Sequence, residues 1–218
     1  MRNLKRVLSL SLALVMVLGL MIVGTGASAA DFTDQDEIVN EDAVNTLVAL
    51  NIIAGKDDGS YFDPTGIVTR GEMAKMICIA LNGGIEPVLG SGSSFTDTAN
   101  HWASSYIEYC VNLKIVAGRG NGTFDPNATV TATEAAKMLL VAMNYDPTVF
   151  GLVGDSWDIN TNTEANQAGL YEDLTHISAS AGLTRDNAAQ MIYNAILAKT
   201  MELTWGQNMT TGEITRSE

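Results

Sequence analysis

The chain has 218 residues and a formal net charge of −13 at pH 7. A protein with this negative charge is not attracted to nucleic acid or to anionic lipid by its overall electrostatic field. Any anionic ligand must therefore be held by a few well-placed hydrogen-bond donors. The two cysteines are too few for the disulfide framework of a small secreted fold.

The start of the chain predicts a secretory signal peptide. Three basic residues within the first six positions precede an apolar stretch from Val7 to Gly24, and Ala27-Ser28-Ala29 has the small-x-small form of a cleavage site. This order of regions is typical of a signal peptide. A retained membrane anchor is the alternative, since an apolar run of this length could just span a bilayer. The polar sequence directly after the site favours cleavage, so we expect export, a signal peptide over residues 1–29, and no membrane segment afterwards.

An internal repeat organises the remainder of the chain. Phe32-Thr33-Asp34 recurs 63 residues later as Phe95-Thr96-Asp97, and Phe62-Asp63-Pro64 recurs 62 residues later as Phe124-Asp125-Pro126. A weaker third copy, which includes the segment from Leu183 to Ile192, lacks the Phe-Asp-Pro turn. We call the predicted ranges 31–84, 93–146 and 157–200 the first, second and third copy.

Each copy predicts a helix, a loop and a second helix. In the first copy, apolar residues between Val44 and Leu50 recur at helical spacing. Gly55 and its counterpart Gly118 are expected to end the first helix as C-cap glycines. A glycine-rich loop follows and closes on Asp-Pro, which favours a turn.

A capping box predicts where the second helix starts. Thr69 to Glu72 and Thr131 to Glu134 both have the form T-x-x-E. In such a box the threonine hydroxyl accepts the N3 amide and the glutamate reaches back to the amide of the cap. Each helix–loop–helix unit is too small to bury its own apolar stripe, so neighbouring copies must pack into one core. The predicted fold class is therefore all-α.

The cysteines and the C-terminal tail carry no chemical motif. Cys78 and Cys110 fall at apolar positions of the repeat, which favours buried free thiols over a disulfide or a metal site. Residues 201–218 fit no fourth copy, and Glu202-Leu203-Thr204-Trp205 could start a strand. We expect no metal and no cofactor.

These motifs resemble those of the S-layer homology (SLH) family. The resemblance rests on Phe-Thr-Asp, on His101-Trp102-Ala103 and on the Gly-x-Phe-Asp-Pro loop. It rests most on Val68-Thr69-Arg70-Gly71-Glu72, which is close to the family's I/V-T-R-A-E signature. The resemblance covers about residues 31–200 and implies a three-copy module with pseudo-threefold symmetry. One helix of each copy would enter a central bundle, with grooves between neighbouring copies.

The resemblance also implies a function. Such grooves bind secondary cell-wall polymers of Gram-positive bacteria, commonly through a pyruvylated amino sugar, so the implied role is non-covalent anchoring of an exported protein at the cell wall or surface layer. The implied partner is a secondary cell-wall polysaccharide or peptidoglycan. The signature arginine could form two charge-assisted bonds to a pyruvyl carboxylate, and the helix N-terminus adds amide donors. The candidate ligand-binding residues are Thr69, Arg70, Glu72, Asp97, Trp102, Thr184 and Arg185.

Departures from the pattern predict one or two competent grooves instead of three. The second copy has Ala132 in place of the arginine, the first has Val39 in place of the tryptophan, and the third has Asn187 in place of the glutamate. Structural alternatives stay open for several candidates. Arg70 could be a solvated residue of the first helical turn, Glu72 a cap, and Trp102 a packing residue.

The sequence gives less support to other functions. No motif of a serine hydrolase, a zinc protease or a phosphate-binding loop occurs, so we expect no enzyme. Asp57-Asp58-Gly59 lies in a loop but lacks the alternating acids and terminal glutamate of a calcium loop. The main alternative is a protein–protein module that assembles a surface lattice with other surface-layer proteins.

Overall fold

The computed structural model describes residues 32–88, 90, 92–178 and 180–198, together with the backbone of two short strands at 204–207 and 214–217. The predicted signal peptide lies outside these residues. None of the described helices is long and apolar enough to cross a membrane.

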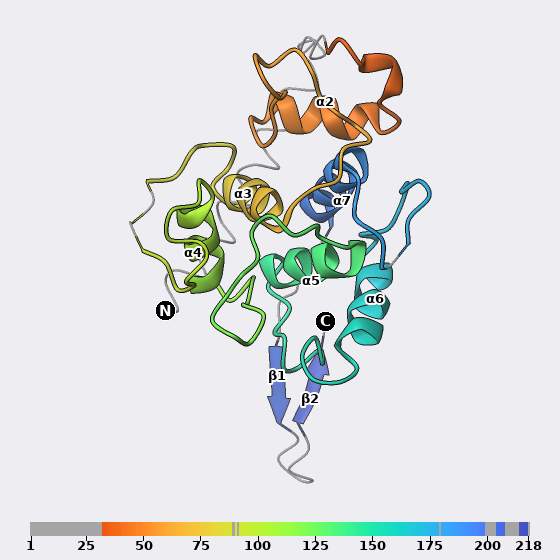
Figure 1. Cartoon of the computed structure of the whole chain (residues 1–218). Helices are drawn as coiled ribbons and strands as arrows, with labels where there is room; N and C mark the ends of the chain where they lie inside the picture. Colours follow the sequence, from red (N-terminus) through yellow and green to blue (C-terminus); the bar gives the residue numbers. More distant parts are fainter. Residues whose placement is uncertain are drawn as a thin grey trace.

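Helices make up the regular structure of the three copies (Figure 1). A short 3₁₀-helix, η1 (Gln35–Glu37), is followed by α2 (Glu41–Ala49), α3 (Arg70–Leu81), α4 (Ser104–Asn112), α5 (Ala132–Ala142), α6 (Trp157–Gln167) and α7 (Arg185–Leu197). Each predicted copy thus contains two α-helices, and the all-α prediction is confirmed for the copies. In the tail, β1 (Thr204–Gln207) pairs antiparallel with β2 (Ile214–Ser217), and β1 begins inside the segment predicted to start a strand.

Capping boxes start two of the longer helices, as the sequence predicts. At α3 the Thr69 side chain accepts the Glu72 N–H at 3.2 Å, and Glu72 Oε2 accepts the Thr69 N–H at 2.8 Å. Thr131 and Glu134 make the same pair of bonds at α5, at 3.2 and 3.0 Å. An N-cap of this kind is worth about 1 kcal/mol. The caps therefore fix where α3 and α5 begin.

The first helices of the first and second copies end earlier than predicted, and not at Gly55 or Gly118. The left-handed residue after α2 is Asn51 (φ 57°), after α4 it is Lys114 (φ 63°), and after α6 it is Gly169 (φ 74°). In each copy the next amide bonds back to a carbonyl five residues earlier, for example Ile115 N–H to Cys110 O at 2.8 Å. This pattern is a Schellman motif, which ends a helix by satisfying its last carbonyls.

Gly55 and Gly118 are glycines for a different reason, which is the close approach of a loop. A Cβ at Gly55 would lie 2.2 Å from the carbonyl oxygen of Gly59, and one at Gly118 would lie 2.7 Å from that of Thr123. Any side chain at these positions would therefore push the Phe-Asp-Pro loop away from its own copy.

The copies are joined by contacts between one copy's second helix and the next copy's first helix. We call these contacts seams: α3 packs against α4 at the first seam, α5 against α6 at the second, and α7 against α2 at the third. The third seam brings the first and last copies together and closes the arrangement (Figure 1). Helices α3, α5 and α7 form the centre, since α5 contacts both of the others.

A closed triangle of backbone hydrogen bonds joins the three copies just before their second helices. Val68 N–H donates to Leu183 O at 2.9 Å, Leu183 N–H to Val130 O at 2.9 Å, and Val130 N–H to Val68 O at 3.0 Å. All three side chains are buried. Because each residue immediately precedes an N-cap threonine, the triangle gathers the three helix N-termini at one place.

The core fills the space between these helices. Its fully buried side chains include Met73, Ile77, Leu140, Met191 and Ile192 of the central helices. Cys78 and Cys110 are both buried and free, as predicted. Burial raises the pKa of the Cys78 thiol to about 12, so this thiol stays protonated at neutral pH.

The left-handed helix ends predict a simple stability experiment. Lys114→Gly should raise the unfolding free energy by about 1 kcal/mol, because glycine occupies this backbone region without the Cβ penalty. The matched variant Asn112→Gly, inside the last turn of α4, should lower it by about 0.5–1 kcal/mol. Urea unfolding of both proteins measures the difference. Equal effects of the same sign would contradict the assigned end of α4.

Candidate functional site

The signature arginine of the first copy points into the second copy. Arg70 Nε donates to Phe124 O at 3.0 Å and Nη2 donates to Ala117 O at 3.2 Å, while the guanidinium lies 4.3 Å from the centre of the Phe124 ring. Glu134 lies 3.5 Å from Nη1. The side chain of Arg70 is 8% exposed. The guanidinium of Arg70 is therefore engaged by groups inside the protein, whereas binding a ligand carboxylate would require an accessible guanidinium. Arg70 is also not the solvated residue of the first helical turn that the sequence left open as an alternative.

Arg185 makes the equivalent contact from the third copy to the first. Its Nη2 donates to Ala54 O at 2.6 Å, and its guanidinium lies 5.0 Å from the centre of the Phe62 ring. Burial lowers the pKa of Arg185, and the nearby Glu72 opposes that shift. Glu72 thus serves both as the cap of α3 and as an acidic neighbour of the arginine from the preceding copy in the ring.

The second copy lacks the arginine at the one place where the arginine would have no partner. Its counterpart is Ala132, and the copy that it faces is the third, which has no Phe-Asp-Pro loop. The third copy also carries Asn187 where the others carry the glutamate that faces an arginine. Asn187 instead accepts the Thr175 N–H at 3.1 Å and donates to Thr175 O at 2.8 Å. The contact between the second and third copies therefore lacks the arginine on the side of the second copy. On the side of the third copy it lacks both the loop and the glutamate.

Asp97 fastens the loop that Arg70 contacts. Its carboxylate accepts the Phe124 N–H at 2.9 Å and the Asp125 N–H at 2.7 Å. Burial alone would raise the pKa of Asp97, but the backbone donors of Phe124 and Asp125 outweigh it, and the pKa is lowered. Asp34 makes the same two bonds in the first copy, to Phe62 and Asp63. The aspartate of Phe-Thr-Asp therefore holds the loop of its own copy.

Trp102 is exposed at the first seam, as a sugar platform requires. The residue is 56% exposed, and its indole lies beside the rings of His101 and Tyr106. Lys75 of α3 lies across the seam, with Nζ 6.0 Å from the Trp102 ring centre and 5.3 Å from that of Tyr106. Burial raises the pKa of Tyr106 to about 12, and its hydroxyl donates to Glu86.

Sequence reasoning missed the matching residues at the second seam. Trp157 begins α6, and Lys137 Nζ lies 5.0 Å from its ring centre. Trp157 stands 13 residues before Leu170, and Trp102 stands 13 residues before the equivalent Ile115. Extending the alignment of the third copy upstream from Leu170 would have found this tryptophan.

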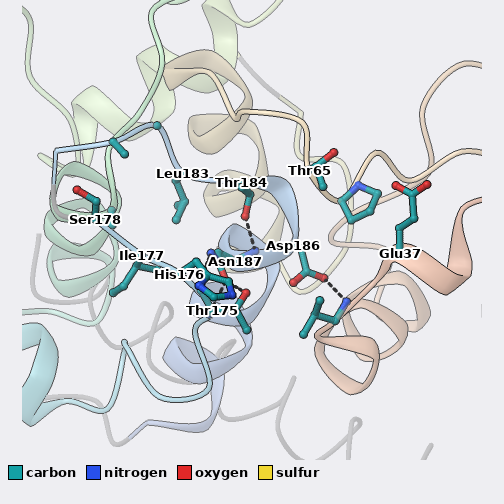
Figure 2. Close-up of a pocket in the computed structure, with 15 residues that line it drawn as sticks. Glu37, Thr65, Thr175, His176, Ile177, Ser178, Leu183, Thr184, Asp186 and Asn187 are labelled. Atoms are coloured by element: carbon teal, nitrogen blue, oxygen red, sulfur yellow. Dashed lines mark hydrogen bonds between the residues drawn. The ribbon is translucent and has the colours of Figure 1, made fainter.

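A pocket of about 260 Å³ opens at the third seam. Figure 2 shows that its walls come from the third-copy loop, the start of α7 and the first-copy segment around Glu37. Hydroxyl groups line it at Thr65, Thr175, Ser178 and Thr184, and apolar surface is supplied by residues such as Val39 and Ile177. Among the described residues that line it there is no lysine or arginine. Of the predicted site residues, Thr184 alone lines this pocket, where it also caps α7.

Asp186 forms the buried polar edge of this third-seam pocket. Its Oδ1 accepts the N–H groups of Val39 and Asn40 at 3.2 and 3.1 Å, and Oδ2 accepts Asn40 Nδ2 at 2.6 Å. Burial raises the pKa of Asp186, and these donors act in the opposite direction. The carboxylate therefore joins the third copy to the start of the first-copy helix, next to an opening lined by hydroxyls.

Comparison with known proteins finds one family. A family profile described as the S-layer homology domain matches residues 31–74 and 94–136. A cell surface protein of Thermoanaerobacter kivui is 32% identical over 200 residues, which cover 90% of this chain and 25% of that protein. A protein of Bacillus anthracis named as an uncharacterized cell wall amidase is 30% identical over 199 residues, which cover 90% of this chain and 35% of that protein. The S-layer protein sap of Bacillus anthracis is 30% identical over 161 residues, 69% of this chain and 19% of that protein. The chain thus spans only a quarter to about a third of the length of the first two relatives.

The arginine geometry predicts a structural cost on substitution. Arg70→Ala should lower the unfolding free energy by about 2–4 kcal/mol, because two charge-assisted bonds to loop carbonyls are lost inside the protein. Arg119→Ala, which removes an exposed arginine with two surface ion pairs, should cost less than about 1 kcal/mol. Denaturant unfolding of both variants compares them. Equal costs would contradict the clamping role of Arg70.

The hydrogen bonds of Asp97 predict a pH-dependent effect. A carboxylate whose folded-state pKa is lowered stabilises the fold above its unfolded pKa, and that stability is lost as pH falls through the folded value. Asp97→Asn should therefore be less stable than wild type at pH 7, and the gap should narrow as pH falls below about 4. Thermal melts between pH 3 and 7 measure this, with the exposed Asp155→Asn as the control of equal charge. A gap that stays constant down to pH 3 would refute the assigned role.

Proposed function

Because the chain belongs to the S-layer homology family, we propose that it anchors at the cell wall by binding a secondary cell-wall polysaccharide without a covalent bond. The protein is an exported protein of the cell surface and associates with the cell wall. The role proposed is one of binding and not of catalysis. We propose further that part of the bound polymer is acidic, for example a pyruvylated amino sugar.

The third-seam pocket is the observation that supports polysaccharide binding most directly. Hydroxyl side chains and apolar surface both line its opening, and such a lining suits a sugar ring, which presents hydroxyls at its edge and C–H groups on its faces. Glu37 and Asp186 contribute carboxylates, and the described residues of the lining include no lysine or arginine. This pocket therefore suits an uncharged sugar unit of the polymer.

The arginines and Asp97 support the same function indirectly. They hold the loops of neighbouring copies in place, and those loops lie beside the seams at which a polymer would bind. Loss of Arg70 or Arg185 would then weaken polymer binding through loss of structure. An arginine variant alone cannot separate a contact with the ligand from support of the fold.

A lattice module is the second candidate function, because relatives with this sequence similarity include proteins named S-layer proteins. Such a module would bind other surface-layer chains and would not need a sugar pocket. Binding to polymer-stripped cell walls and self-association in solution separate the two functions.

We expect the mature protein to co-sediment with cell-wall sacculi and to lose binding when acid treatment strips the secondary polymer. Thr65→Trp and Ser178→Trp place indoles at exposed positions of the pocket and should weaken binding by about tenfold or more, which corresponds to 1.4 kcal/mol. Asn112→Trp, on the exposed end of α4, should bind like wild type.

Three other outcomes would change the conclusion. Full binding to stripped sacculi would identify peptidoglycan as the partner. Unchanged binding by both pocket variants would remove the pocket from the proposal. Absence of binding to any sacculus, together with concentration-dependent self-association, would favour the lattice module.

A further inference from the structure

Two Asn-Gly pairs occur in the chain, and the fold places them in different environments. Asn121-Gly122 lies in the Phe-Asp-Pro loop of the second copy, and both residues are exposed. Asn82-Gly83 lies at the end of α3, and both residues are half-buried. In such a pair the glycine amide can attack the asparagine side chain, because glycine has no Cβ to hinder the approach. The hydrogen bonds around each pair decide which of them is free to react.

The groups that must react are free at Asn121. Among the described residues, neither the Gly122 N–H nor Asn121 Nδ2 has a hydrogen-bond acceptor. The Thr123 N–H donates to Asn121 Oδ1 at 3.1 Å, and the Thr123 hydroxyl donates to the same oxygen at 2.6 Å. Negative charge develops on this oxygen when a nucleophile adds to Cγ, so two donors aimed at it stabilise the tetrahedral intermediate. The turn therefore combines a free attacking amide with an activated carbonyl.

The same groups are engaged at Asn82. The Gly83 N–H donates to Ala80 O at 3.1 Å, and Asn82 Nδ2 donates to Ile85 O at 2.8 Å. The attacking amide and the leaving amide are thus both held by backbone carbonyls. Because these bonds belong to the end of α3, they must break before the side chain can be attacked. The folded protein therefore protects one of its two Asn-Gly pairs.

The first copy provides an internal comparison for the exposed pair. Asp58, Gly59 and Ser60 take the equivalent positions of its loop. Asp58 Oδ1 accepts the Ser60 N–H at 3.0 Å, so a carboxylate fits this turn. The Gly59 N–H donates to Lys56 O at 2.8 Å, in contrast to the free amide of the second copy. An aspartate formed at position 121 would thus have the side chain that the first copy already accommodates.

We propose that Asn121 is a site of spontaneous deamidation, which alters the loop clamped by Arg70. The Gly122 nitrogen forms a bond to Asn121 Cγ, and the bond between Cγ and Nδ2 breaks. Hydroxide takes the proton of the Gly122 amide, and Nδ2 takes up a proton and leaves as ammonia. Water then opens the resulting cyclic imide. Opening at Cγ gives aspartate, and opening at the backbone carbonyl gives isoaspartate, in which the main chain runs through Cγ.

The two products differ in their effect on the loop. Aspartate keeps the length of the main chain. Isoaspartate adds a methylene group between Arg119 and Thr123, which are joined by the bond from Arg119 N–H to Thr123 O at 2.9 Å. Arg70 holds the loop on both sides of this insertion, at Ala117 O and Phe124 O. The longer chain must therefore disturb these hydrogen bonds, so we expect isoaspartate to lower the stability of the protein and aspartate to leave it nearly unchanged.

The test incubates the folded mature protein in mildly alkaline buffer made with water labelled with heavy oxygen. Peptide mapping by mass spectrometry then measures the label at each site, which marks imide hydrolysis during the incubation, and an isoaspartyl methyltransferase assay measures isoaspartate. We expect Asn121 to deamidate at least about tenfold faster than Asn82, because two hydrogen bonds must first break at Asn82. In concentrated urea, where the fold is lost, the two sites should react at similar rates.

Two substitutions of Thr123 test the activated carbonyl. Thr123→Val removes the hydroxyl that donates to Asn121 Oδ1, and Thr123→Ser keeps a hydroxyl there. We expect the valine variant to deamidate about five- to tenfold more slowly than wild type when folded, and the serine variant to match wild type. All three proteins should react equally in urea, because the effect belongs to the folded turn.

Three results would overturn parts of this inference. Equal rates at Asn121 and Asn82 in the folded protein would show that the fold does not select the site. Absence of label at Asn121, under conditions in which the unfolded chain reacts there, would show that the turn protects the residue. Thermal melting of the purified isoaspartate form at the temperature of Asn121→Asp would overturn the effect on the clamped loop and leave the modification site itself intact.

Discussion

The triangle of backbone hydrogen bonds among Val68, Val130 and Leu183 is the constraint on which the rest of the molecule depends. Each residue donates to one neighbouring copy and accepts from the other, so no copy can complete its bonding alone. Buried backbone groups are costly when unpaired, and closure of the triangle therefore requires all three copies at once. An N-cap threonine follows each of these residues. Closure of the triangle therefore also sets the direction of each second helix, and with it the seam that this helix forms with the next copy.

This closure explains why changes in one copy are matched in another. An arginine at the first helical position contacts the loop of the next copy and approaches the glutamate at the third position of that copy's helix. The second copy faces a copy without the loop, and there arginine and glutamate are both replaced, by Ala132 and Asn187. A buried arginine without partners would cost several kcal/mol, so alanine is the compatible residue. The signature of each copy is thus determined by its neighbour in the ring.

The sequence predicts much of the fold and less of the site. The T-x-x-E pattern predicts the start of α3 and of α5 to the residue, because a capping box is local and needs only four positions. The pattern does not reveal where Arg70 points, since a repeat shows which residues are equivalent but not which copies touch. The ends of the first helices were misassigned to Gly55 and Gly118, because glycine serves close loop contacts as readily as left-handed turns, and Lys114 at a left-handed position gives no signal. Trp157 was missed because no motif surrounds it in the third copy.

The distribution of charge follows from the same geometry. A chain of this acidity can bind an anionic polymer only where its own carboxylates are absent or already engaged. Glu72 and Glu134 are engaged as caps, Asp97 and Asp34 by loop amides, and Asp186 by the start of the first copy. The internal hydrogen bonds that hold the loops, helix starts and copies in place therefore also engage these five carboxylates.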